Sequence, residues 1–310
     1  MATTPFSINP ELTAIAIAFQ NPDSVLIADS VLPRTPVSKK FSWTKTDVAQ
    51  GFTVPDTAVG RKSAPNQVDL KSTSQSAECV DYALDDAVPN ADIQADNMGV
   101  DPLGKAVMGI ANYLKLSREV RVAGMVFNTA NYAANQTATL AGNDQWSNAA
   151  SDPIAAIKDY FDSMLIRPNI GILGQTTWSK ISRHPKIVQA IYKTNQGAGV
   201  VTRQAFAELF ELQELYVGSS FVNIKAPGQN PTFNRVWGNH AAFLYRDRVA
   251  GTQTGVTFGF TGQFGEVIAG SMEDRDVGMR GGIRVRVGES LKEIICSPEC
   301  GFYFQNAVAA

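Results

Sequence analysis

One short stretch of the chain combines acidic and basic side chains at spacings that could support chemistry. It consists of four consecutive residues and three arginines that follow them: Glu273, Asp274, Arg275, Asp276, Arg280, Arg284 and Arg286. Carboxylates and arginines occur together in phosphoryl-transfer sites, but the sequence supplies no accompanying phosphate loop or metal-ligand set. Because Arg284 and Arg286 are two residues apart, they lie on one face of a predicted strand. We expect this face to be either a solvated strand edge or a set of ion pairs between subunits.

The histidines and cysteines offer no second catalytic pattern. His184 precedes Pro185, where ending or capping a helix explains it, and His240 has no neighbouring Cys or Ser nucleophile pattern. Cys296 and Cys300 form a lone C-x3-C without a second pair at zinc spacing. Buried thiols are the favoured interpretation, with a disulfide or a metal site as alternatives. The sequence therefore favours a protein that is not an enzyme and that has no cofactor.

Composition indicates a globular chain that associates with other protein. Of the 310 residues, 44% are hydrophobic and 18% are charged, which is fewer charges than usual and suits a chain that loses surface to subunit contacts. The net charge of -2 gives no cationic field that would attract nucleic acid or an anionic membrane. The apolar stretch 12–19 follows Glu11 and has no basic region before it, so it is not a signal peptide. No stretch is long enough for a membrane span, and we expect synthesis in the cytoplasm.

Two extended segments begin the chain. Residues 1–40 contain five prolines and many apolar side chains, which predicts an arm that docks on protein, either its own subunit or a neighbour. Residues 41–89 alternate polar and apolar side chains in two runs around a tip at 58–66, which predicts a hairpin. With limbs of about 15 to 20 residues it could project about 50 Å.

The hairpin needs a partner, because an isolated two-stranded ribbon is marginally stable in water. A subunit that clasps its neighbours has a use for such an element, and a monomeric enzyme does not. Basic residues at the tip have the same two interpretations as the arginine-rich strand, a solvated surface or ion pairs with a neighbour. The candidates for subunit contacts on the hairpin are Trp43, Lys45, Arg61, Lys62 and Lys71.

A long helix is predicted over residues 101–132. Asp101 is a good N-cap, and Pro102 stands at the first helical position, where its missing N–H costs nothing. Apolar residues then recur at helical spacing from Leu103 to Phe127. Such a helix would extend about 45 Å.

From residue 151 onward the pattern changes to alternating helices and strands. Helices are predicted from Pro153, over 176–191 and after Thr202, with strands at 167–174 and 214–218. Further strands are predicted at 241–245, 256–261, 283–287 and 301–304. The expected class is α+β, with the second domain either α/β or α+β.

The order of short motifs in this second half resembles a known family. Three segments carry the resemblance: Arg183-His184-Pro185-Lys186-Ile187, the helix that follows Thr202, and Glu214-Leu215-Tyr216-Val217-Gly218. With the strand after Arg167-Pro168-Asn169, they run in the order seen in major capsid proteins of tailed bacteriophages that have the Hong Kong 97-type fold. The close resemblance covers about residues 165–222. The order of arm, hairpin, long helix and returning C-terminal strand extends it to the whole chain.

The resemblance implies a division of the chain and a function. It implies an arm (1–40), an extended hairpin or E-loop (41–89), a peripheral domain (90–150 and 290–310) with the spine helix 101–132, and an axial domain (151–289). It implies a coat subunit that assembles as hexamers and pentamers into an icosahedral virion shell around double-stranded DNA. A portal and a decoration protein are further implied partners. Since no long charged helix begins the chain, a separate scaffolding protein is expected. An encapsulin-like shell that packages a cargo enzyme remains the alternative.

Overall fold

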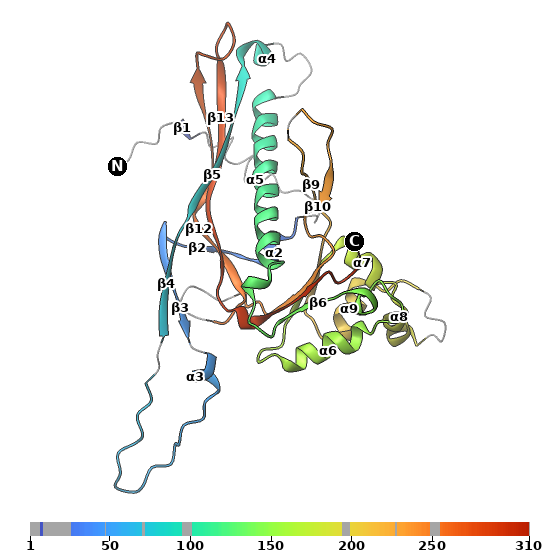
Figure 1. Cartoon of the computed structure of the whole chain (residues 1–310). Coiled ribbons are helices and arrows are strands. Elements are labelled where there is room, and N and C mark those ends of the chain that lie inside the picture. The colour runs from blue at the N-terminus through green and yellow to red at the C-terminus, as the bar shows by residue number, and fades with distance from the viewer. Residues whose placement is uncertain are drawn as a thin grey trace.

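The computed structural model describes residues 7–8, 26–46, 48–69, 72–94, 101–193, 199–226, 228–248 and 255–309. An elongated part contains one long helix packed along a long sheet, and a second body lies beside one end of it (Figure 1). Most of the predicted arm, and Lys71 among the predicted contact residues, lie outside the described ranges.

The long helix α5 (Pro102–Val126) begins as predicted. Both side-chain oxygens of Asp101 accept hydrogen bonds, from Leu103 N and Gly104 N, and Pro102 opens the first turn. The helix ends six residues before the predicted boundary at 132. The Tyr132 hydroxyl donates to the carbonyl of Val126, which satisfies a backbone group at the end of the helix and turns the chain away.

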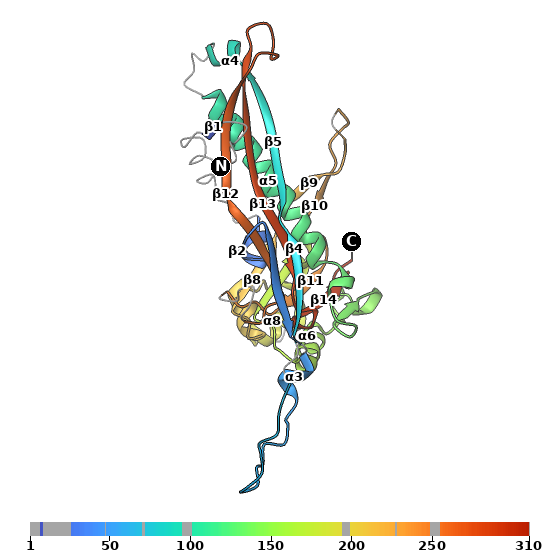
Figure 2. The same ribbon diagram turned by 90° about the vertical axis from the view of Figure 1, so that its left-hand side faces the viewer.

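The long sheet packs against one side of α5 (Figure 2). Its order is β1 (Ser7–Ile8), β12 (Gly259–Asp274), β13 (Gly282–Ile295) and β5 (Val80–Pro89), with β2 (Arg34–Pro36) parallel to β12. The strand predicted at 256–261 starts three residues too early and ends far too soon, and the strand predicted at 283–287 is a short part of β13. A register shift between Phe264 and Ile268 interrupts β12, and Gly265 adopts a φ of 68° there.

A second sheet forms the body beside this elongated part. Its order is β6 (Thr137–Thr139), β14 (Gly301–Gln305), β11 (Ala241–Leu244), β7 (Ile170–Gly174) and β8 (Glu214–Gly218). The predicted strands at 214–218, 241–245 and 301–304 are confirmed within a residue. Gly218 packs so closely on Trp237 that a Cβ there would lie 2.1 Å from the indole ring.

Four helices accompany this sheet, and they are α6 (Pro153–Ser163), α7 (Gln175–Ile181), α8 (Pro185–Tyr192) and α9 (Arg203–Leu209). The single helix predicted at 176–191 is wrong, because Pro185 cannot continue the hydrogen bonding of the preceding turn and starts a new helix. The predicted helix starts at Pro153 and after Thr202 are confirmed. Both are capped by a side chain, Asp152 and Thr202 respectively.

The sheets cross the predicted domain boundaries. We expected residues up to 289 to belong to the axial domain, yet β12 and β13 pair with each other and with β5 in the long sheet. Conversely, β14 lies in the sheet of the second body, although residues 290–310 were predicted to be peripheral. The predicted boundaries between the domains therefore remain a prediction.

The projecting hairpin is shorter in its paired part than predicted. Strands β3 (Lys40–Thr46) and β4 (Ser72–Glu78) form an antiparallel ribbon of seven residue pairs. After the short helix α3 (Val48–Phe52), residues 53–69 extend away without strand pairing (Figures 1 and 2). Residues 80–89, assigned to the hairpin from the sequence, pair instead with β13.

Candidate assembly surfaces

The base of the hairpin is fixed to its own subunit. Phe41 is buried against Phe260 of β12, with ring centres 6.3 Å apart, and Trp43 packs on Phe41 at 6.2 Å. Part of the Trp43 side chain therefore packs in a core of its own subunit, and only the remainder is available to contact a neighbouring subunit. Lys45, also predicted as a contact residue, is half-buried on the same strand. This packing holds the direction in which the loop leaves the subunit.

Residues 53–69 form the projecting loop, and all of them are exposed in the single subunit. Val54 is 91% exposed, and Phe52, Val59 and Val68 expose half or more of their surface. Asp56 orders one part of this loop, since its side chain accepts from Ala58 N and its carbonyl accepts from the Asn66 amide. Apolar side chains held on an ordered but uncovered segment are typical of a surface that binds protein.

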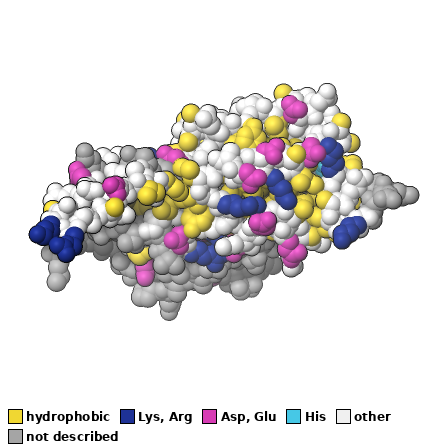
Figure 3. Space-filling model, turned by 90° about the horizontal axis from the view of Figure 1, so that it is seen from below, with side chains coloured by type: hydrophobic (Ala, Val, Ile, Leu, Met, Phe, Trp, Pro, Cys, Tyr) yellow, Lys and Arg dark blue, Asp and Glu magenta, His cyan; other side chains and the backbone are white. Residues whose placement is uncertain are grey.

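Arg61 and Lys62 lie at the turn of the projecting loop and are exposed, as predicted. Seen from the loop end, basic side chains gather at the edge where the loop lies, whereas acidic and basic side chains are interspersed over the remaining face (Figure 3). The tip thus carries a local positive charge on a surface that otherwise has no dominant sign.

The arginine-rich strand is paired within its own subunit. Arg286 donates two hydrogen bonds to Asp85, of 2.6 and 2.7 Å, and Arg284 donates from Nε to Asp274 at 2.9 Å. Hydrogen bonds from Arg286 hold the pKa of Asp85 below its usual value. The sequence placed these arginines on one face, and the structure supplies carboxylate partners without a second subunit. Asp85 was missed because its place opposite Arg286 depends on the register of β5 and β13.

The other members of this cluster lie at the turn between β12 and β13. Glu273, Arg275, Asp276 and Arg280 are exposed, and the Arg280 carbonyl accepts from the side-chain amide of Asn90. The backbone N–H of Asp276 donates to Asp274 at 3.0 Å and is the main cause that lowers the pKa of Asp274. The turn therefore presents charges of both signs at the end of the elongated part.

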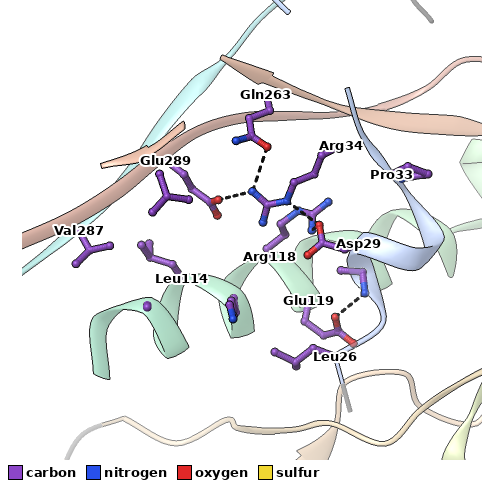
Figure 4. A pocket seen from close by; sticks show the side chains of 14 residues that line it. Leu26, Asp29, Pro33, Arg34, Leu114, Arg118, Glu119, Gln263, Val287 and Glu289 are labelled. Atoms are coloured by element: carbon purple, nitrogen blue, oxygen red, sulfur yellow. Dashed lines mark hydrogen bonds and ion pairs between the residues drawn. The ribbon is translucent and has the colours of Figure 1, made fainter. Parts of the chain in front are cut away.

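A partly buried ionic cluster, which was not predicted from the sequence, joins the N-terminal segment to the spine helix (Figure 4); the Asp29 side chain in it is 62% exposed. Arg118 of α5 is 2% exposed and donates to Asp29, to the Leu32 carbonyl at 3.1 Å and to Thr261 at 3.0 Å. Arg34 donates to Asp29 at 2.7 Å and to Glu289 of β13 at 2.7 Å. Burial raises the pKa of Asp29, but the two arginines together lower it by more, so the net shift of this pKa is downward.

Glu119, the next residue on α5, is fully buried and accepts hydrogen bonds from three directions. One oxygen accepts from Ile27 N at 2.9 Å and from Trp237 Nε1 at 2.6 Å, and the other accepts from Ala28 N at 2.8 Å. Ser220 also reaches this carboxyl group, at 3.5 Å. Burial raises the pKa of Glu119, while these donors oppose the shift. A single side chain thus ties the N-terminal segment and the second body to the spine helix.

These charged residues line a cavity of about 640 Å³ between α5, β13 and the segment that contains α2 (Ala28–Val31). Apolar residues line the remainder, including Leu114 and Val287. In the described part of the chain, no three His, Cys, Asp or Glu side chains are grouped closely enough to hold a metal ion.

Both histidines make hydrogen bonds within the fold, and His184 stands just before α8 without capping it through its side chain. His184 Nε2 lies 3.2 Å from the Ser151 hydroxyl and 3.0 Å from the Asn148 carbonyl, but both side chains of the Ser–His pair are buried. A substrate could not reach that pair. His240 accepts from Asn306 N at 3.0 Å and thereby holds the end of β14. Among the helices described, none is long and apolar enough to span a membrane.

Comparison with known proteins connects this architecture to phage heads. A family model described as phage major capsid protein E matches residues 126–262. The major capsid protein of Pseudomonas phage JBD67 is 51% identical over 311 residues, which cover 100% of both chains. The chain belongs to the phage major capsid proteins. It is therefore a structural subunit of the virion shell and not an enzyme.

Solved structures show the same fold. A phage-related protein from Bordetella bronchiseptica RB50 superposes with a TM-score of 0.75 at 22% identity, covering 99% of this chain and 100% of that one. The capsid of cyanophage P-SCSP1u gives a TM-score of 0.56 at 9% identity, covering 98% and 90% of the two chains. The predicted α+β fold of the Hong Kong 97 type is confirmed. The encapsulin-like alternative is less supported, since the full-length relative is a phage coat protein.

Proposed function

We propose that copies of this capsid protein join as hexamers and pentamers into a closed icosahedral shell that encloses double-stranded DNA. Self-association follows from its family, and the proposal adds the arrangement of the copies and the contents. The projecting loop 53–69 carries the argument, because its apolar side chains have nothing to cover them in one subunit.

In this proposal the loop lies across the adjacent subunit. Its anchored base, built from Phe41 and Trp43 on Phe260, supports a fixed direction of approach and reduces the entropy lost on binding. Val54, 91% exposed, is the strongest apolar anchor. Arg61 and Lys62 would face acidic groups of the neighbour, where paired charges set the register.

Of the candidate contact residues in the arginine-rich cluster, we now favour those at the turn over those on the strand. Arg284 and Arg286 are already paired with Asp274 and Asp85, so a neighbour would meet a largely neutralised face there. The exposed charges of the turn, Glu273, Arg275, Asp276 and Arg280, are better placed for contacts between subunits. Lys71 remains a candidate from the sequence alone.

Non-specific enclosure of DNA fits the charge of the subunit. A net charge of -2 supplies no general attraction for phosphate, so we expect weak, salt-sensitive binding without sequence preference. A separate scaffolding protein, a portal and a decoration protein complete the proposal. Synthesis in the cytoplasm of the host bacterium also belongs to it.

Replacing the projecting loop tests this proposal. Residues 54–68 are replaced by a Gly/Ser segment of equal length, and a deletion of the same residues is made in parallel. Both variants should leave the isolated subunit folded, because the loop contributes no side chain to the described cores. We expect both to prevent shell formation under conditions in which the unaltered chain assembles. Normal shells from the Gly/Ser variant would show that the loop does not recognise its neighbour.

A further inference from the structure

A second, smaller ribbon projects from the protein and is also uncovered. Strands β9 (Phe221–Asn223) and β10 (Phe233–Arg235) pair antiparallel, and the ribbon extends from the second body alongside α5 (Figure 1). Phe221 is 49% exposed, Ile224 54% and Phe233 62%. Two-stranded ribbons are marginally stable alone, so one with exposed aromatic residues calls for a partner.

One face of this ribbon is built like a binding surface. Phe221 lies opposite Arg235 and Asn223 lies opposite Phe233, and residues directly opposite each other point to the same side of a ribbon. The Arg235 guanidinium stacks over the Phe221 ring at 4.4 Å. Aromatic and arginine side chains on one face are the types enriched at the centres of protein interfaces.

The ribbon is held in place before any partner binds. Asn223 Oδ1 accepts from Lys225 N at 3.1 Å and from Thr232 N at 3.0 Å, which orders the start and end of the loop. At the base, Trp237 donates to the buried Glu119 of the spine helix. A surface fixed in this way loses little entropy on binding.

A second exposed surface lies at another edge of the second body. Leu165, just after α6, is 57% exposed, and α6 exposes Asp159 and Asp162 nearby in sequence. Arg167, which follows, is paired with Glu211 at 3.3 Å. The ribbon segment 219–236, in contrast, contains Lys225 and Arg235 and no acidic residue. The ribbon thus offers exposed apolar groups beside two cations, and the end of α6 offers exposed Leu165 beside two exposed carboxylates.

The two elements lie apart, since the ribbon rises beside α5 while α6 lies at the far edge of the second body (Figure 1). Copies arranged head to tail around a ring bring different, opposite surfaces of each subunit together. We infer that the β9–β10 ribbon of one subunit packs its Phe221 and Phe233 face against the Leu165 end of α6 in a second copy. This inference rests on the proposed function, because it requires ring-like self-assembly.

A second copy suits the ribbon better than DNA. Two cations are too few to hold a duplex at physiological salt, and the three exposed apolar side chains have no phosphate to meet. In the contact that we infer, Lys225 and Arg235 lie near Asp159 and Asp162 and set the register.

Cysteine cross-linking tests the contact in assembled particles. Phe233→Cys and Leu165→Cys are introduced together and singly, with all native cysteines kept, and the particles are oxidised and separated without reductant. The double variant should give a ladder of covalent oligomers, because each subunit links to the next. Phe233→Cys combined with Val200→Cys, a 63% exposed site elsewhere on the second body, is the matched control and should give no ladder.

Several results would overturn the inference. Particles of the double variant without a ladder would contradict this contact while leaving the proposed shell intact. A ladder of equal strength from the Val200 pair, or dimers from Phe233→Cys alone, would show non-specific or ribbon-to-ribbon contact. Should the double variant fail to assemble, a mixture of the two single variants must give covalent dimers only. Failure of the unaltered chain to form any ring or shell would reject the proposed function itself.

Discussion

Glu119 offers the sharpest test of how the subunit is held together. Replacing it by Ala removes the acceptor for three buried donors: Ile27 N, Ala28 N and Trp237 Nε1. Each buried donor left unpaired costs about 1 to 3 kcal/mol, and water entering from the adjoining cavity recovers part of this. We therefore expect Glu119→Ala to lower the free energy of unfolding by about 3 to 5 kcal/mol. Glu119→Gln keeps one acceptor oxygen and should lose about 1 to 3 kcal/mol.

The assay is urea unfolding of the unassembled subunit, followed by tryptophan fluorescence and circular dichroism. Glu266→Gln, at an exposed position on β12, is the matched control and should change the unfolding free energy by less than about 0.5 kcal/mol. Amide exchange of Ile27 and Ala28 gives a local readout, since both N–H groups donate to Glu119. A loss below about 1 kcal/mol for Glu119→Ala, without faster exchange at these amides, would refute the tie between the three elements.

Three further predictions concern other charged or ionisable groups. The pKa of Asp29 is lower in the folded protein than its unfolded value of 3.8. The ionised carboxylate therefore stabilises the fold above pH 3.8, and this stabilisation is lost as the pH falls below that value. Asp29→Asn should make the free energy of unfolding less sensitive to acid. Burial raises the pKa of Cys296 to about 12 and that of Cys300 to about 11. Both thiols should therefore react slowly with a disulfide reagent at pH 8 and rapidly once urea unfolds the chain, whereas fast reaction of the folded protein would contradict the raised pKa values. Arg284→Glu should lower the melting temperature of the unassembled subunit, because it places a third acidic group beside the carboxylates of Asp274 and Asp85. An unchanged melting temperature together with lost assembly would show instead that Arg284 acts in a contact between subunits.

Local signals in the sequence were sufficient for several elements. Asp101 followed by Pro102 marked the start of the spine helix, and Thr202 marked the start of α9, because caps are decided by a few neighbouring residues. The short strands of the second body were found for a similar reason, as continuous apolar runs of strand length. The end of α5 was missed, since it depends on Tyr132 folding back onto Val126.

Non-local features could not be found in the same way. Strand β12 contains Gly259, Gly262, Gly265 and Gly270, which break the alternation that would have revealed its length. Residues 80–89 were wrongly assigned to the hairpin, because nothing in their polar pattern identifies β13 as their pairing partner.

Arg118 and Glu119 do have a signal in the sequence. Two charges stand within the helical stripe between Leu114 and Val122, on a face that is otherwise apolar. Charged side chains at such positions are rare unless paired, so they indicate a buried partner. The identity of that partner, an N-terminal segment some 90 residues away, requires the fold.

An electron-microscopy reconstruction of particles formed by the purified chain, with a scaffolding protein added where needed, tests the central claim most directly. We expect closed shells or capsomer rings in which density for the projecting loop 53–69 crosses the adjacent subunit. Sedimentation as a compact monomer under every assembly condition, or particles in which the loop contacts only its own subunit, would contradict the account.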